Sequence, residues 1–378
     1  MTQRRSAGEG SIFRRADGRW CAHVALHSGQ RRYVYGRTRQ DVAVKLRAAV
    51  KSREEGLPLP PTRETVESFL TSWLEQQRSR VRPRTWMRYE QFVRIHVLPV
   101  LGKVLLNHLG PQHIERLYAD RRAAGVGAVS VHHLHTVLHK AFEQATRWNL
   151  IQRNVVRLVD TPRMPRREMS VLAPPEVRTL LASAAGGPLE ALLALAATTG
   201  MRRGELLATR WRDVELERGV LRVTGSLQRD TSGVLRITEP KTARSRRQVE
   251  LSSLAVEALL RHRTQQTEHR LRLGEEWQDH DLVFPNPRGL PQDGSHMVAG
   301  QFLPLLTRAG LPRIRFHDLR HTAATLMLGR GVHPKIVSEV LGHSTIGITL
   351  DLYSHVTPTM QRAAAQAMDE VLGPQRPE

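Results

Sequence analysis

The stretch Thr199-Gly200-Met201-Arg202-Arg203-Gly204-Glu205-Leu206 decides how the C-terminal half of this chain is interpreted. It follows an apolar run, Leu189 to Ala197, which predicts a buried helix. Gly200 is typical of the turn that ends such a helix, and Arg202 then opens the next one. A guanidinium at a helix start adds its fork of donors to the positive end of the helix dipole, which suits a bound phosphate group.

A second string, His317-Asp318-Leu319-Arg320-His321-Thr322, places a candidate acid or base beside a second guanidinium. His317 and Arg320 are three residues apart, so they are neighbours on one face of a helix. His317 and His321 are four apart and loosely resemble the H-E-x-x-H zinc motif, which would indicate a metal-dependent phosphodiesterase. That motif requires glutamate where this chain has Asp318, and the zinc would need a third protein ligand.

Two further strings follow near the C-terminus. In Leu341-Gly342-His343-Ser344 a glycine ends a predicted helix and a histidine comes directly after it. Ten residues later stands Tyr353, and the other four tyrosines all lie at or before residue 118. The C-terminal half therefore offers a single phenol as a candidate nucleophile, although the simplest interpretation of Tyr353 alone is a half-buried aromatic.

In order and approximate spacing, these four strings resemble the signature of the tyrosine recombinase (phage integrase) family, and the resemblance covers essentially the whole chain. It implies a site-specific DNA recombinase that cuts and rejoins DNA through a 3′-phosphotyrosine intermediate, without metal, ATP or another cofactor. Tyr353 would be the nucleophile, and Arg202 and Arg320 would hold the phosphate oxygens. His317 would serve as the base toward Tyr353, and His343 would donate a hydrogen bond to the phosphate.

The resemblance also implies two supporting residues. The family has a catalytic lysine in the turn between two strands of a β-hairpin, and Lys241 stands between two strand-like runs as the only lysine between Lys140 and Lys335. Glu205 would orient Arg202, and His321 would be structural. The family further implies four protomers on two DNA duplexes, with DNA-bending or directionality proteins as accessory partners.

Charge independently predicts a polyanionic partner. The chain has 378 residues, with 57 Lys+Arg against 36 Asp+Glu. The first 165 residues hold 29 basic and 13 acidic side chains, so most of the excess lies there, and double-stranded DNA is the simplest partner. The arginines expected to contact the DNA backbone are Arg14, Arg15, Arg31, Arg32, Arg82, Arg84, Arg88, Arg244, Arg246 and Arg247.

Two proline-rich linkers, Leu57–Pro61 and Asp160–Arg167, predict three domains. Residues 1–56 are expected to form a three-stranded sheet and a helix, similar to the family's arm-type DNA-binding module. Residues 62–160 predict four helices, and they resemble the family's core-site DNA-binding domain. Residues 170–378 predict a mixed, mainly α domain with a small β-sheet and a C-terminal helix, and they resemble the family's catalytic domain. The C-terminal helix could pack on its own domain or, as is the family's habit, on a neighbouring protomer. The expected fold class is therefore multidomain and mainly α.

Several classes of protein are excluded by what the sequence lacks. There is no apolar run long enough to span a membrane, no apolar signal segment within Met1–Gly8 and no P-loop motif. Cys21 is the only cysteine, which excludes an internal disulfide and cysteine-based metal centres, and fits a cytoplasmic, nucleoid-associated protein. A non-catalytic DNA-binding regulator and a topoisomerase or telomere-resolving relative are the alternatives that stay open.

Overall fold

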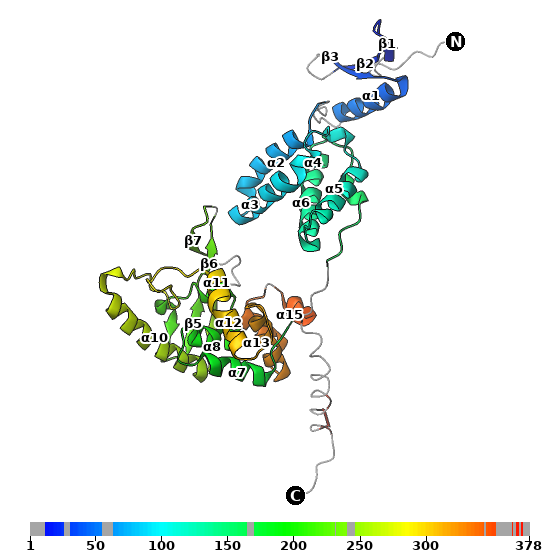
Figure 1. Ribbon diagram of the computed structural model, residues 1–378. Coiled ribbons are helices and arrows are strands. Elements are labelled where there is room, and N and C mark those ends of the chain that lie inside the picture. The colour runs from blue at the N-terminus through cyan, green and yellow to red at the C-terminus, as the bar shows by residue number, and fades with distance from the viewer. Residues whose placement is uncertain are drawn as a thin grey trace. The chain divides into compact units, whose positions relative to one another are not determined.

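The computed structural model describes residues 12–25, 31–54, 63–164, 170–230, 232–239, 246–343 and 345–352, with positions 365, 368, 369 and 372 (Figure 1). The chain divides into two compact units, Met1–Arg166 and Arg167–Glu378. Within these described ranges no helix combines the length and the apolar character that crossing a membrane requires. The predicted fold class, mainly helical with small sheets, is confirmed, whereas the division into three domains stays a prediction.

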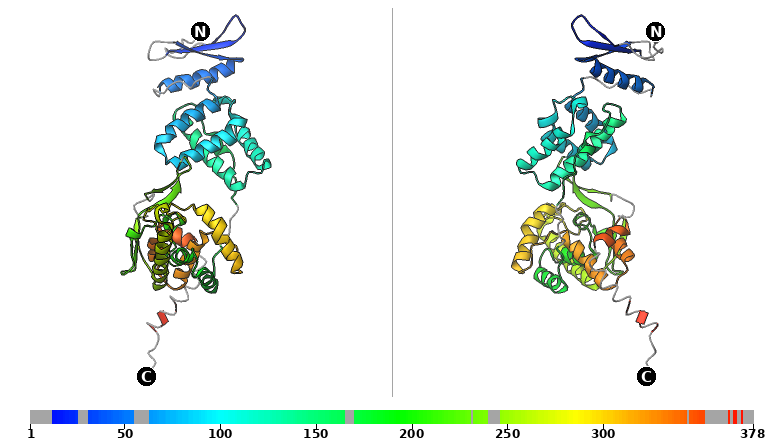
Figure 2. Two further views of the ribbon diagram at one scale, coloured as in Figure 1. Left: turned by 60° about the vertical axis from the view of Figure 1, so that its left-hand side comes forward. Right: turned by 90° about the vertical axis from the view of Figure 1, so that its right-hand side faces the viewer.

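The N-terminal end of the first unit is a three-stranded antiparallel sheet packed on one helix (Figure 2). The elements are β1 (Ile12–Arg14), β2 (Trp20–Ala25), β3 (Arg31–Gly36) and α1 (Arg39–Glu54). Alternate strand residues face the helix, because Ala22, Val24 and Val34 share one buried cluster with Val42 and Leu46 of α1. The predicted three strands and helix are confirmed.

The rest of the first unit is a helical bundle with a core of its own. Its long helices are α2 (Val66–Arg80), α3 (Pro83–Phe92), α5 (Pro111–Ala123) and α6 (Ala128–Arg147). Shorter helical turns are η1 (Val93–Val97), α4 (Leu98–Leu101), η2 (Leu106–His108) and η3 (Val155–Leu158). Phe69 and Trp73 on α2 and Phe142 on α6 are fully buried, so these aromatic side chains form part of the core, as their helical spacing predicts.

The second unit is built around one enclosed helix, α8 (Glu190–Thr199), whose residues are buried from Ala191 to Ala196. The other helices are α7 (Pro174–Ala184), α9 (Arg203–Leu206), α10 (Ser253–Leu273), α11 (Gly294–Met297), η7 (Val298–Phe302), α12 (Leu303–Arg308), α13 (Asp318–Gly329), α14 (Pro334–Leu341) and α15 (Ile346–Leu352). Helix α15 is not predicted from sequence, because its seven residues are too few to show a helical period.

Two small antiparallel sheets complete the second unit. One has the order β4 (Val214–Glu215), β5 (Val220–Val223), β8 (Arg247–Glu250), and the other is the hairpin of β6 (Ser226–Arg229) and β7 (Leu235–Thr238). The strands flanking Lys241 are β7 and β8, which pair with β6 and β5 respectively. The strands that flank Lys241 in sequence thus belong to different sheets, and the antiparallel pair that encloses its position in the chain is β5 with β8.

Candidate active site

Arg202 lies at the turn between α8 and α9, where Gly200 ends α8 in the left-handed conformation (φ +62°). Its Nη1 donates to Glu205 Oε1 at 2.7 Å, and its Nη2 donates to the Gly342 carbonyl at 3.0 Å. The Arg202 side chain keeps 39% of its surface exposed, whereas that of Glu205 keeps 5%. Arg202 is therefore held by protein contacts and still accessible to a ligand.

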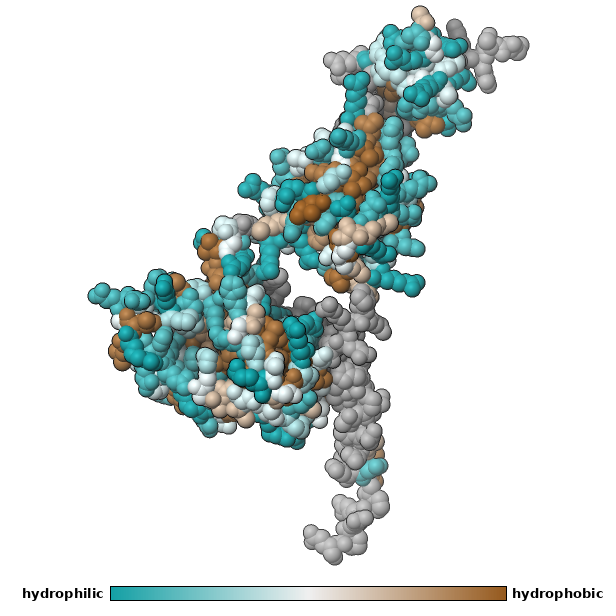
Figure 3. Space-filling model, in the orientation of Figure 1, coloured by the Kyte–Doolittle hydropathy of each residue, from teal (hydrophilic) through white to brown (hydrophobic). Residues whose placement is uncertain are grey.

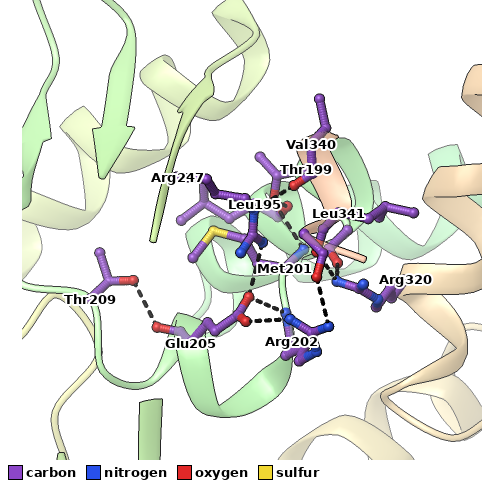
Figure 4. A network of polar contacts seen from close by, with 12 residues as sticks. Leu195, Thr199, Met201, Arg202, Glu205, Thr209, Arg247, Arg320, Val340 and Leu341 are labelled. Atoms are coloured by element: carbon purple, nitrogen blue, oxygen red, sulfur yellow. Dashed lines mark hydrogen bonds and ion pairs between the residues drawn. The ribbon is translucent and has the colours of Figure 1, made fainter. Parts of the chain in front are cut away.

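Arg320 reaches the same turn from α13. Its Nη1 donates to the Leu341 carbonyl at 2.7 Å and to the Gly200 carbonyl at 3.0 Å. Arg202 and Arg320 thus bind successive carbonyls, Gly342 and Leu341, although 118 residues separate them in sequence (Figure 4). The fold brings the two predicted guanidiniums together at the C-terminal end of α14.

Glu205 joins Arg202 to a third guanidinium, that of Arg247 on β8. Arg247 Nη2 donates to Glu205 Oε2 at 3.0 Å, and its Nε donates to the Val340 carbonyl at 2.6 Å (Figure 4). Burial alone would raise the pKa of the Glu205 carboxyl, but Arg247 and Arg202 together hold that pKa below its ordinary value. Glu205 is therefore an ionised bridge between two arginines.

This geometry corrects one expectation. We expected Arg247 to contact the DNA backbone, but its side chain is only 7% exposed and is directed at Glu205 and Val340. The Arg247 guanidinium is thus engaged by Glu205 and the Val340 carbonyl, and through Glu205 it supports the neighbouring Arg202. Arg246, next to it, is exposed and pairs with Glu239 at 2.9 Å.

Three histidines, His317, His321 and His343, lie within electrostatic reach of the Arg320 guanidinium. The His317 and His321 rings, at the start of α13, meet edge to face with centroids 5.2 Å apart. Partial burial, followed by the neighbouring His321 and Arg320, lowers the pKa of His317 to about 4. Burial, followed by Arg320 and Arg202, lowers the pKa of His343 to about 4 as well. Both imidazoles are therefore neutral at pH 7, and His317 is itself accessible to solvent.

His343 lies two residues after Leu341, the last residue of α14, and hydrogen bonds hold both its backbone and its ring. Its backbone N–H donates to the Ser338 carbonyl at 3.0 Å, and its ring Nδ1 lies 2.7 Å from the Thr349 hydroxyl of α15. Thr349 is fully buried. Thr349 is absent from the residues predicted from sequence, because no local motif marks a hydroxyl that meets a histidine six residues before it.

Several predicted residues lie outside the part of the chain that the structure describes. They are Tyr353, Lys241 and Arg244, together with the side chain of Arg32. The C-terminal helix predicted after Pro358 lies almost entirely outside it too. What the structure gives are the flanks: α15 ends at Leu352, immediately before Tyr353, and β7 and β8 bracket Lys241. The roles of these residues stay predictions.

The arginines expected to contact DNA in the first unit are exposed. Arg14 is the last residue of β1, Arg15 follows it, and Arg31 is the first residue of β3. The guanidinium carbon of Arg15 lies 5.7 Å from the centroid of the Tyr35 ring. Arg82, Arg84 and Arg88 lie at the start of α3 and along it. In the view of Figure 3 the surface of the sheet module, which comprises β1, β2, β3 and α1, is mostly hydrophilic. These side chains are therefore accessible to a partner in solution.

The residues that the structure describes offer no third ligand to the His317 and His321 pair. Among the residues it describes, no group of three or more His, Cys, Asp or Glu side chains is arranged to hold a metal ion. Asp318, which takes the place of the motif's glutamate, pairs instead with Arg315 at 2.6 Å and is 3% exposed at its side chain. Asp318 is thus committed to a structural ion pair at the start of α13.

Gly342 is where we expect a single methyl group to disturb the cluster. Gly342→Ala should lower the free energy of unfolding of the second unit by about 1–2 kcal/mol, because φ is +68° and a left-handed conformation is costly for alanine. The new Cβ would also lie 2.8 Å from Arg247 Nη1. Urea unfolding of the full chain measures the loss.

The matched control for that substitution is Gly329→Ala in α13, where the added Cβ meets open space and φ is ordinary. This control should be neutral or slightly stabilising, because alanine restricts the unfolded chain. Equal losses in the two variants would contradict the argument from Gly342.

Comparison with known proteins places this geometry in a family. Residues 170–360 match the Phage integrase family, and residues 65–120 match the phage integrase N-terminal SAM-like domain. An integrase of Streptomyces ambofaciens is 29% identical over 391 aligned positions, which span 100% of both chains.

Two solved structures share the fold. The Tn1549 transposon integrase in complex with transposon right end DNA has a TM-score of 0.67 at 22% identity, over 82% of this chain and 100% of that one. A lambda integrase tetramer bound to a Holliday junction has a TM-score of 0.57 at 20% identity, over 92% and 96% of the two chains.

Proposed function

This chain belongs to the phage integrase family of tyrosine recombinases, which cut and rejoin DNA at specific sites, and we propose that Tyr353 is its nucleophile. The observation that carries the proposal is the convergence of Arg202, Arg320 and His343 at the end of α14. The accessible guanidinium of Arg202 lies there within electrostatic reach of the neutral His343 imidazole, and Arg320 lies within reach of both His343 and His317. No non-catalytic DNA-binding role requires that combination.

In the proposed reaction the Tyr353 oxygen attacks the scissile phosphorus. A Tyr353 Oη–phosphorus bond forms, the bond from phosphorus to the 5′-oxygen breaks, and a 3′-phosphotyrosine and a free 5′-hydroxyl result. Negative charge develops on the non-bridging oxygens of the phosphate, and Arg202 and Arg320 offset it. The reverse attack by a 5′-hydroxyl of another strand restores the DNA backbone, so ester energy is conserved and no ATP is consumed.

Proton transfer is assigned to two residues, and hydrogen bonding to the phosphate is assigned to a third. His317 is neutral at pH 7 and accepts the phenolic proton of Tyr353 as the general base. Lys241 donates a proton to the departing 5′-oxygen. His343 donates a hydrogen bond to the phosphate. Because cationic side chains supply the positive charge, we propose no metal cofactor.

The substrate is double-stranded DNA, and both parts of the first unit are proposed to bind it. The sheet module, with Arg14, Arg15 and Arg31, would bind arm-type sites, and the helical bundle, with Arg82, Arg84 and Arg88, would bind core sites. We further propose a homotetramer on DNA, as in the lambda integrase complex, with accessory DNA-bending or directionality proteins. The protein would work with the nucleoid in the cytoplasm as the integrase of a mobile element.

A plasmid assay tests this function. The full-length protein, incubated with a supercoiled plasmid carrying two recombination sites, should yield exchanged products, and covalent protein–DNA adducts should be trapped by denaturation with detergent. Both should persist in EDTA. Activity lost in EDTA and restored by zinc would favour the metal-dependent alternative. Relaxation without exchange would favour a topoisomerase, and binding without any adduct would favour a regulator.

A further inference from the structure

From the contact between α15 and the residue after α14, we infer that Thr349 is a positioning residue that sets the tautomer and orientation of His343. The inference deepens the proposed function and rests on it. The contact joins the Thr349 hydroxyl to Nδ1 of the His343 ring at 2.7 Å. Thr349 is 0% exposed, so water does not compete for its hydroxyl.

The hydrogen-bonding capacities of the Thr349 hydroxyl and the His343 ring determine which of the two donates the hydrogen bond. A neutral imidazole carries one N–H, on either Nδ1 or Nε2, and whichever nitrogen lacks it is an acceptor. Burial and the guanidiniums of Arg320 and Arg202 keep His343 neutral at pH 7. A neutral ring that faces an anionic phosphate must present its proton there. The Thr349 hydroxyl therefore donates to Nδ1, and the single ring proton stays on Nε2, the nitrogen turned away from Thr349.

Other contacts already fix the backbone around His343, so the contact with Thr349 acts on the orientation of the imidazole ring. The His343 N–H donates to the Ser338 carbonyl, and the preceding Gly342 carbonyl accepts from Arg202 Nη2. Neither contact restricts rotation of the imidazole. The Thr349 hydroxyl supplies that restriction, and it does so from α15, the helix that ends immediately before Tyr353. One hydrogen bond thus connects the phosphate-binding histidine to the segment leading into the nucleophile.

Three substitutions separate the hydroxyl from the shape of the side chain. Thr349→Val keeps the shape and removes the hydroxyl, and single-turnover cleavage of a nicked DNA substrate should slow about tenfold, with unchanged DNA affinity. Thr349→Ser keeps the hydroxyl and should cleave nearly as fast as the parent protein. If the valine variant fails to fold, Thr349→Ala against Thr349→Ser makes the same comparison, because both lack the methyl group.

A double-mutant cycle tests whether Thr349 acts through His343. In a His343→Ala background, Thr349→Val should slow cleavage no further, since there is no ring to position. A valine variant as fast as the parent, a serine variant as slow as the valine one, or an equal slowing in the His343→Ala background would each overturn the inference. Failure of the proposed function looks different: the parent protein itself would then form no covalent adduct.

Discussion

Tyr353→Phe abolishes the covalent DNA adduct and leaves DNA binding intact; this is the largest effect that we expect from one substitution. Phenylalanine lacks the oxygen that forms the phosphotyrosine bond, so adduct formation should fall by at least about 10³-fold. The loss of one hydroxyl removes no positive charge, so affinity for DNA, which depends on the cationic surface, should not change. Denaturing gels of labelled DNA measure the adduct, and gel shifts under native conditions measure the binding.

The other tyrosine best suited as a control is Tyr89, which is partly buried in the helical bundle and stacks on Trp73. Tyr89→Phe should form the adduct at the parent's rate. A Tyr353→Phe protein that still forms adducts would remove this residue as the nucleophile and would send the search to another oxygen or sulfur nucleophile.

Arg202→Ala slows DNA cleavage by about 10²–10³-fold, which is the effect of removing one preorganised donor from a developing oxyanion. The structure sharpens this expectation, because Arg202 is oriented by Glu205 and by the Gly342 carbonyl before any ligand binds. Loss of the guanidinium also leaves Glu205 with Arg247 as its remaining ion-pair partner among the described contacts. Single-turnover cleavage on a nicked substrate measures the rate.

The matched control is Arg212→Ala in the same unit. Arg212 is exposed and approaches Asp281 only at 3.8 Å, so its contribution to stability is small. Its loss also lowers the net charge by one, as the loss of Arg202 does, and this separates a general electrostatic effect from a local one. Comparable slowing in both variants would mean that the phosphate site lies elsewhere.

Most of the secondary structure was predictable, because helical periods, capping residues and turn signals depend on residues close together in sequence. The stripes of α2 and α6, the proline that opens α5 and the glycine that ends α8 are all local signals, and each element is present. Short elements without a full period were not predictable: both α15 and β6 were missed. The partners of β7 and β8 depend on contacts that no local pattern specifies.

The order and spacing of four short strings determined the family, and with it the candidate residues Arg202, Arg320, His317, His343 and Tyr353. Only the tertiary structure decided what each described side chain contacts. It turned Arg247 from an expected DNA contact into a buried partner of Glu205, and it brought Thr349 to His343. For the arginine cluster the physical reason is distance along the chain: the Arg202–Gly342 hydrogen bond joins residues 140 apart, and such contacts form only when separate helices pack around α8.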